Sequence, residues 1–110
     1  MAFERSKYTA QFKEESRERL QAMARCLTAC REKAGRGDAL RNIIKGAHTI
    51  RGSATMLGYA RIAAIARELE SGLEGALSQE ITMWRPLLDK IAGQLTSMEM
   101  LLEKIACEQE

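Results

Sequence analysis

The stretch ALRNIIKGAHTIRGSATMLG, residues 39–58, decides the fold class of this chain. At about 100° per residue its apolar side chains gather within a sector of roughly 100°, which predicts an amphipathic helix over residues 39–57. These side chains are Leu40, Ile43, Ala47, Ile50, Ala54 and Leu57. Asp38 is a suitable N-cap for this helix, and Gly58 is expected to end it.

Three further segments show helical spacing of apolar residues, over residues 5–33, 60–77 and 82–107. Gly35 is a plausible cap for the first segment, and Pro86 is tolerated in or just after the first turn of the last one. Each helix has to bury its apolar stripe, and short connections make consecutive helices antiparallel neighbours. The sequence therefore predicts an all-α protein, an antiparallel up-down four-helix bundle forming a single domain over residues 1–110.

The apolar stripes define the expected core. In the first segment the stripe consists of Tyr8, Phe12, Leu20, Met23, Leu27 and Cys30. In the third it consists of Ile62, Ile65, Ala66, Leu69, Leu73 and Leu77, and in the fourth of Ile81, Trp84, Leu88, Ile91, Leu95, Met98, Leu102 and Ile105. Ser78 and Thr82 offer caps for the fourth helix.

Composition excludes several classes of protein. Aromatic residues are only 5%, which argues against a sheet and against base stacking, and the net charge of +2 is too small to indicate a nucleic-acid or membrane partner. No apolar run approaches the roughly 20 residues that span a bilayer, and the N-terminus lacks a signal core. We expect a cytoplasmic monomer. Cys26, Cys30 and Cys107 lack the spacing of a metal site and are expected to be reduced.

His48, the only histidine, lies about 140° from the centre of the apolar sector and should face solvent. Its neighbours one turn away are Ile44 and Gly52. A glycine inside a helix costs roughly 1 kcal/mol relative to alanine, and on an exposed face core packing does not offset that cost. The glycine does leave room for another molecule to approach the imidazole.

Basic residues flank the same face, with Lys45 three residues before His48, Arg51 three after it and Arg41 seven before it. A neutral imidazole has a free ring nitrogen for nucleophilic attack, and nearby cations would favour an added phosphoryl group. An exposed histidine on a helix is, however, often an ordinary surface residue. Spacing alone leaves both interpretations open.

Residues 47–58, AHTIRGSATMLG, closely resemble the signature of histidine phosphotransfer (Hpt) domains. The positions that match this signature are His48, Ile50, Arg51, Gly52, Ser53, Ala54, Leu57 and Gly58. The continuation YARIAAIARELES resembles the next helix of the family, and the upstream FKEESRERLQAM resembles the opening helix of the phosphotransfer domain of chemotaxis-type histidine kinases. The likeness covers nearly the whole chain.

This resemblance implies a role for each of four residues. His48 would be phosphorylated at Nε2, and Arg51 would favour the phosphoryl charge. Gly52 would give partners access. Glu70 would hydrogen-bond Nδ1 of His48, as in the chemotaxis kinases; it lies roughly 80° from the apolar centre of its helix, where it could also be an ordinary solvated glutamate. The sequence departs from the commonest pattern at Arg51, where lysine is more frequent, and Glu70 replaces the glutamine of many relay-type domains.

The implied donor is a histidine kinase catalytic domain or an upstream receiver domain, and the implied acceptor is an aspartate of a response-regulator receiver domain. The exposed basic side chains, Arg61 among them, suit an acidic receiver pocket. The docking and access residues are expected to be Gly52, Lys45, Arg41, Ile44, Thr55 and Arg67. The chain has no phosphate-binding loop or acidic metal set, so we expect no cofactor and no metal here, no autonomous kinase activity, and ATP and magnesium only in the partners.

Two other interpretations stay open at this point. One is a helical docking module that binds receivers or other acidic partners without transferring phosphoryl groups, with His48 incidental to its function. The other concerns the whole protein rather than the domain. The chain could be a free-standing phosphotransfer protein or the N-terminal part of a larger kinase.

Overall fold

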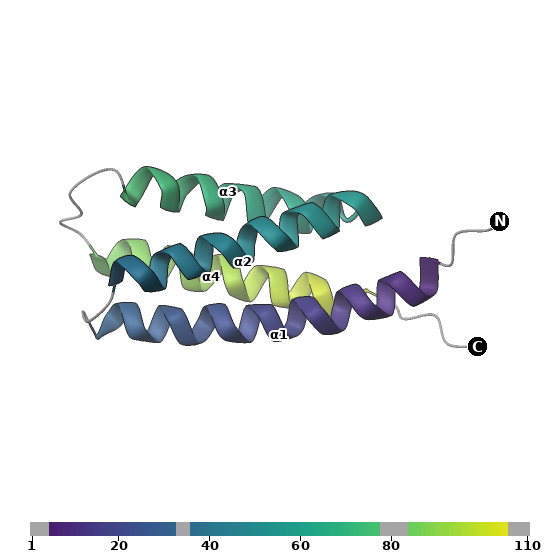
Figure 1. Ribbon diagram of the computed structural model, residues 1–110, viewed down its shortest axis with the longest axis horizontal. Helices are drawn as coiled ribbons and strands as arrows, with labels where there is room; N and C mark the ends of the chain where they lie inside the picture. The colour runs from purple at the N-terminus through teal and green to yellow at the C-terminus, as the bar shows by residue number, and fades with distance from the viewer. Residues whose placement is uncertain (1–4, 33–35, 78–83, 106–110) are drawn as a thin grey trace.

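The protein folds as a bundle of helices in the computed structural model, which describes residues 5–32, 36–77 and 84–105. The helices are α1 (Arg5–Arg31), α2 (Arg36–Leu57), α3 (Ala60–Leu77) and α4 (Trp84–Glu103). They run alternately up and down along the long axis of the molecule (Figure 1). The predicted all-α, up-down four-helix bundle is therefore confirmed for the described residues.

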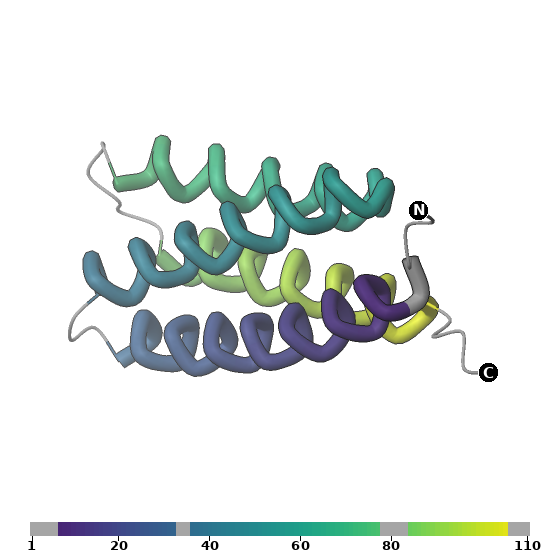
Figure 2. The backbone as a smooth tube through the Cα atoms, turned by 45° about the vertical axis from the view of Figure 1, so that its right-hand side comes forward, coloured from purple at the N-terminus to yellow at the C-terminus, as the bar shows by residue number. Residues whose placement is uncertain are grey.

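The helices form a ring in which each one packs against two others. α2 packs against α1 and α3, and α4 packs against the other sides of α1 and α3. α2 and α4 therefore lie diagonally across the bundle, as the views of Figures 1 and 2 agree. The bundle is long and thin, 52 × 20 × 19 Å, so its core is one continuous column of side chains. The outer faces of α2 and α3 stay uncovered beside each other.

The apolar sector of α2 forms the centre of this core. Leu40, Ile43, Ala47, Ile50, Ala54 and Leu57 are all buried, as predicted. The predicted stripes of α3 and α4 are also largely confirmed, since only Leu77 among their described members is exposed, at 36%. Ile65, Trp84 and Ile105 are half-buried and pack against the core. Ile81 lies outside the described residues.

The prediction for the start of the α1 stripe was wrong. Tyr8 is 47% exposed, and the buried face of α1 instead passes through Thr9 and Ser16. The cause is Tyr59, which stacks on Phe12 with ring centroids 5.4 Å apart. The Tyr59 hydroxyl lies 3.2 Å from Oγ1 of Thr9, within hydrogen-bond distance, so a small polar side chain fits this position better than a second aromatic ring.

Several helix ends differ from the prediction. α2 begins at Arg36 rather than Ala39, so Asp38 lies in its first turn instead of capping it. A carboxylate there still interacts favourably with the positive end of the helix dipole. α4 begins at Trp84, which places Pro86 in its first turn, where a missing N–H costs nothing. The expected caps Gly35, Ser78 and Thr82 lie outside the described residues.

Gly58 ends α2 as predicted, and it fixes how α3 returns. Its φ of 84° is a left-handed conformation that glycine adopts without a steric penalty. The N–H of Gly58 donates to the carbonyl of Thr55 at 3.2 Å, and the N–H of Tyr59 donates to the carbonyl of Ala54 at 2.8 Å. These two bonds form a Schellman motif. The tight reversal lays the last two turns of α2 against the first turns of α3.

Gly46 allows a close approach of α1 to α2, which helical periodicity does not predict. A Cβ at this position would lie 2.5 Å from Sδ of Met23 and 2.8 Å from its Cγ. Because Met23 is itself 2% exposed, it has little room to move aside. The glycine is therefore a packing residue on the buried side of α2, two positions before the exposed His48.

Cys26 and Cys30 lie at the opposite end of the bundle from the α2–α3 turn. Cys30 is buried and Cys26 half-buried, and neither forms a disulfide. Burial raises the pKa of the Cys30 thiol, which keeps it protonated and unreactive near neutral pH. The Nε of Arg36 donates to the carbonyl of Cys30 at 2.7 Å, and the guanidinium stacks 4.1 Å above the ring of Trp84. Arg36, at the start of α2, therefore connects the end of α1 to the start of α4. Cys107 lies outside the described residues.

Candidate functional site

The candidate site lies where the uncovered faces of α2 and α3 meet. His48 projects from α2 and its side chain is 63% exposed, which confirms the prediction that it faces solvent. Glu70 projects from α3 toward it and is only 14% exposed. The antiparallel return of α3 brings these two side chains together across 22 positions of sequence. The structure thus places Glu70 beside His48. Periodicity alone assigned Glu70 only to a position at the boundary of the apolar face of its helix.

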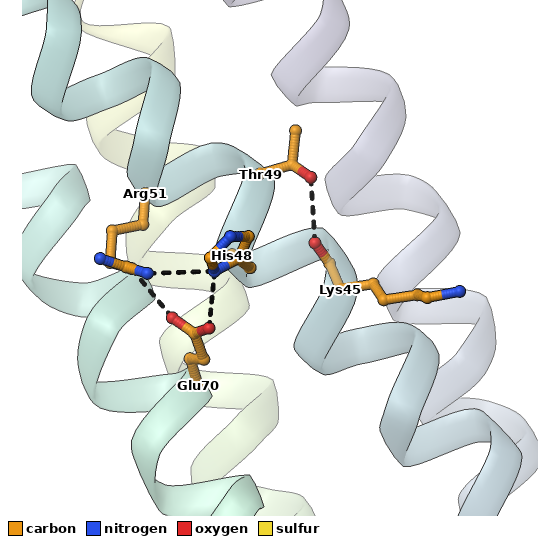
Figure 3. Close-up of polar contacts among 5 residues, drawn as sticks. All are labelled: Lys45, His48, Thr49, Arg51 and Glu70. Atoms are coloured by element: carbon orange, nitrogen blue, oxygen red, sulfur yellow. Dashed lines mark hydrogen bonds and ion pairs between the residues drawn. The ribbon is translucent and has the colours of Figure 1, made fainter.

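Three side chains form one hydrogen-bonded cluster, drawn in Figure 3. Oε2 of Glu70 lies 2.8 Å from Nδ1 of His48. Nε of Arg51 donates to the other carboxylate oxygen, Oε1, at 2.9 Å. Nη2 of Arg51 lies 3.0 Å from the same Nδ1. We call His48, Arg51 and Glu70 the histidine cluster.

The carboxylate determines the tautomer of the ring. An ionised carboxylate only accepts hydrogen bonds, so the 2.8 Å contact requires the hydrogen to lie on Nδ1 of His48. In the neutral ring Nε2 then carries a lone pair and no hydrogen. Nε2 lies on the side of the ring away from Glu70 (Figure 3). The cluster therefore presents an unprotonated nitrogen nucleophile toward solvent, with a carboxylate behind it.

Arg51 is part of the cluster, but on the Nδ1 side of the ring. Its guanidinium pairs with Glu70, and the Arg51 side chain as a whole is 31% exposed. A phosphoryl group on Nε2 would lie on the opposite side of the imidazole. In this arrangement Arg51 contacts the carboxylate of Glu70, and its expected role of favouring the phosphoryl charge stays a prediction.

Gly52 leaves open space beside the histidine, as expected. A Cβ built at this position meets no atom within 4 Å. Gly52 lies one turn after His48 on the exposed face of α2, so a side chain here would project into the approach to the ring. Packing within the bundle does not explain the glycine at this position. The open space is what a partner approaching the ring would require.

Replacing Gly52 with glutamine is expected to stabilise the bundle and to slow phosphoryl transfer. The free energy of unfolding should rise by about 0.5 kcal/mol, because glutamine has the higher helix propensity. Transfer of a phosphoryl group should slow about tenfold, which corresponds to a loss of about 1.4 kcal/mol in docking. Denaturant unfolding and initial transfer rates measure the two effects.

Gly93 supplies the matched control for that substitution. It is an exposed glycine inside α4 with nothing within 4 Å of a built Cβ, and α4 does not pack against α2. Gly93→Gln should raise stability similarly and leave transfer unchanged. Equal transfer rates for both variants would show that the space beside His48 is not used.

The predicted docking residues are not all directed toward the ring. The side chain of Lys45 points away from His48 (Figure 3). Nη1 of Arg41 pairs with Asp38 at 3.2 Å, and Ile44 is half-buried against the core. Thr55 and Arg67, by contrast, line one shallow hollow of about 270 Å³ on the α2–α3 face. Arg61 lines another hollow, near the α2–α3 turn.

A further hollow lies between α1 and α2, and helical periodicity did not predict it. Its volume is about 330 Å³, and its lining includes Tyr8, Phe12, Ser53 and Met56. Met56 is 80% exposed although it is a large apolar residue. The sequence feature that could have indicated this hollow is Met56, a large apolar residue outside the apolar sector of α2. The hollow borders the same exposed side of α2 as Gly52.

Metal-binding clusters and membrane-spanning helices are absent from the part of the chain that the structure describes. Among residues 5–32, 36–77 and 84–105, no group of three or more His, Cys, Asp or Glu side chains could hold a metal ion. None of the helices in these ranges is both long and apolar enough to cross a membrane.

Residues 7–106 match the Hpt domain family. The chain belongs to this family. Its function is therefore histidine phosphotransfer in phosphorelay, or two-component, signalling, and Hpt domains interact with receiver domains and histidine kinases. No solved structure was found to match the chain. The family assignment fits the exposed imidazole on a helical bundle, because a carrier of this kind has to present its histidine to other proteins.

Proposed function

We propose that His48 is the residue of this Hpt domain that becomes phosphorylated by a partner, and that it reacts through Nε2. The observation that carries the proposal is the 2.8 Å contact between Nδ1 of His48 and Oε2 of Glu70. This contact leaves Nε2 as a nucleophile on a side chain that is 63% exposed. A group with this geometry can receive a phosphoryl group without any movement of the bundle.

In the transfer step each bond that breaks is matched by one that forms, and a carboxylate of this chain balances the charge that develops. In transfer from a receiver, the P–O bond of an aspartyl phosphate breaks as the Nε2–P bond forms, and the aspartate leaves as a carboxylate. The ring, still protonated at Nδ1, becomes cationic. The carboxylate of Glu70 balances that charge as it develops. Reversal of the same step delivers the group to a receiver aspartate.

Within the Hpt family we assign the domain to the type found in chemotaxis-type histidine kinases. Support comes from Glu70, whose carboxylate contacts His48 at the position where many relay domains carry glutamine. The donor would then be a kinase catalytic domain, with ATP and magnesium held by the partners in the cytoplasm. The acceptor would be a response-regulator receiver. Gly52, one turn after His48, together with Thr55 and Arg67, which line a hollow on the same α2–α3 face, would contact the partner.

The test is transfer from a receiver domain that carries a radiolabelled aspartyl phosphate. The label should appear on the Hpt domain in a bond that is stable to alkali and labile to acid, as a phosphoramidate is. It should then return to a fresh, unlabelled receiver. A parallel incubation with kinase and ATP identifies which partner is the better donor. A chain that binds receivers but never carries label would be a docking module, which would contradict the proposal.

A further inference from the structure

Nδ1 of His48 has two neighbours that make opposite demands on it. Oε2 of Glu70, at 2.8 Å, can only accept a hydrogen bond and requires a hydrogen on Nδ1. Nη2 of Arg51, at 3.0 Å, can only donate one and would require a lone pair there. Nδ1 cannot carry a hydrogen and present a lone pair in the ring plane at the same time. In the neutral ring each corresponds to a different tautomer.

The two tautomers differ in reactivity. With the hydrogen on Nδ1, Nε2 keeps its lone pair and can attack phosphorus. With Arg51 donating to Nδ1, the hydrogen moves to Nε2, and the exposed nitrogen is no longer a nucleophile. Which neighbour Nδ1 bonds to therefore decides whether the exposed ring nitrogen can react.

One side chain keeps the second tautomer from forming. Glu70 receives Nδ1–H through Oε2 and holds Arg51 through Oε1, where Nε of Arg51 donates at 2.9 Å. The side chain of Glu70 is only 14% exposed, so its carboxylate has few alternative partners in solvent. Without the carboxylate, Nη2 of Arg51 would remain about one hydrogen-bond length from Nδ1 with nothing to oppose its donation.

We propose that Arg51 is a tautomer-selecting residue whose effect on His48 reverses sign with the state of Glu70. While Glu70 is present, Arg51 orients the carboxylate and favours the reactive Nδ1–H tautomer. When Glu70 is removed, Arg51 donates to Nδ1 and favours the unreactive Nε2–H tautomer. Arg51 acts through its neighbours in both cases, so it is a positioning residue. The proposal rests on the proposed function for its kinetic consequence only.

Nitrogen-15 NMR of the imidazole tests this directly, because the chain contains a single histidine. Protein labelled with 15N-histidine and free of a polyhistidine tag gives the signals of one ring. Spectra recorded at about pH 9, where an imidazole is neutral, report the fraction of each tautomer. No phosphoryl donor or partner is needed for this measurement.

Four proteins form the decisive set: wild type, Arg51→Ala, Glu70→Ala and the double variant. Wild type should be mainly the Nδ1–H tautomer, and Arg51→Ala should lower that fraction. Glu70→Ala should be mainly Nε2–H. Adding Arg51→Ala to Glu70→Ala should then raise the ratio of Nδ1–H to Nε2–H about threefold to tenfold, the worth of one hydrogen bond. Transfer rates should follow the same reversal of sign.

Two control variants separate tautomer selection from other effects. Lys45→Ala removes a cation one turn from His48 whose side chain points away from the ring, and it should leave the tautomer ratio unchanged in either background. Glu70→Gln keeps a carbonyl oxygen acceptor and should restore part of the Nδ1–H fraction lost in Glu70→Ala.

The proposal is overturned if removing Arg51 from Glu70→Ala leaves the Nδ1–H fraction unchanged or lowers it. It is also overturned if Lys45→Ala shifts the ratio as much as Arg51→Ala does. Failure of the proposed function looks different, because label would then never reach His48 in any variant while the tautomer ratios still changed as described.

Discussion

Replacing His48 with glutamine is expected to abolish labelling of the domain by any donor. Glutamine keeps a polar side chain of similar reach, but its amide nitrogen has no free lone pair for attack on phosphorus. Because the His48 side chain is 63% exposed, the free energy of unfolding should change by no more than about 0.5 kcal/mol. Transfer from a labelled receiver and denaturant unfolding measure the two quantities.

The value of this variant is that it separates docking from transfer. The glutamine protein should still bind the receiver with an affinity close to that of wild type, since Gly52, Thr55 and Arg67 are unchanged. Label on the variant equal to that on wild type would exclude His48 as the acceptor. Loss of both binding and label would leave docking, rather than chemistry, as the role of His48.

Replacing Glu70 with alanine is expected to lower the transfer rate about 10- to 100-fold, which is the second large effect. Removing a carboxylate that orients a metal-binding histidine costs about 10- to 100-fold, and we expect a similar cost for this histidine. The alanine cannot accept from Nδ1–H, cannot balance the cationic ring and leaves Arg51 beside Nδ1. Stability should fall by no more than about 1 kcal/mol, because the ion pair with Arg51 is partly exposed. Initial rates at saturating receiver separate this effect from docking.

Glu68 provides a matched control on the same helix. It is exposed, carries the same charge, and Nε2 of Gln94 on α4 donates to its Oε1 at 3.4 Å, so it belongs to a different face of α3. Glu68→Ala should transfer at the wild-type rate. If Glu70→Ala also transfers at that rate, Glu70 is no part of the chemistry and the 2.8 Å contact is only structural.

Much of the fold could be predicted from the sequence because one physical signal dominated it. The apolar sector of α2 is wide and regular, and every residue assigned to it is buried. Gly58 was equally clear, since a left-handed C-terminal residue is a local property. The start of the α1 stripe was not predictable in this way, because Tyr59, far away in sequence, decides that Thr9 rather than Tyr8 is buried.

The site was predictable in its members more than in its geometry. Exposure of His48 followed from helical periodicity, but the pairing with Glu70 depended on the resemblance to the Hpt family, since tertiary packing across α2 and α3 creates it. Periodicity did not reveal that Arg51 lies on the Nδ1 side of the ring, because that depends on its rotamer and on the carboxylate it binds. Gly46 was missed because the reason for it is Met23 on another helix.

The most direct test of the central claim is to determine which atom carries phosphorus in the phosphorylated domain. Protein labelled with 15N-histidine and phosphorylated by its donor can be analysed by 31P and 15N NMR. A one-bond coupling between phosphorus and Nε2 of His48, with the hydrogen retained on Nδ1 beside Glu70, is the predicted result. Phosphorus on Nδ1, or on a residue other than His48, would contradict it.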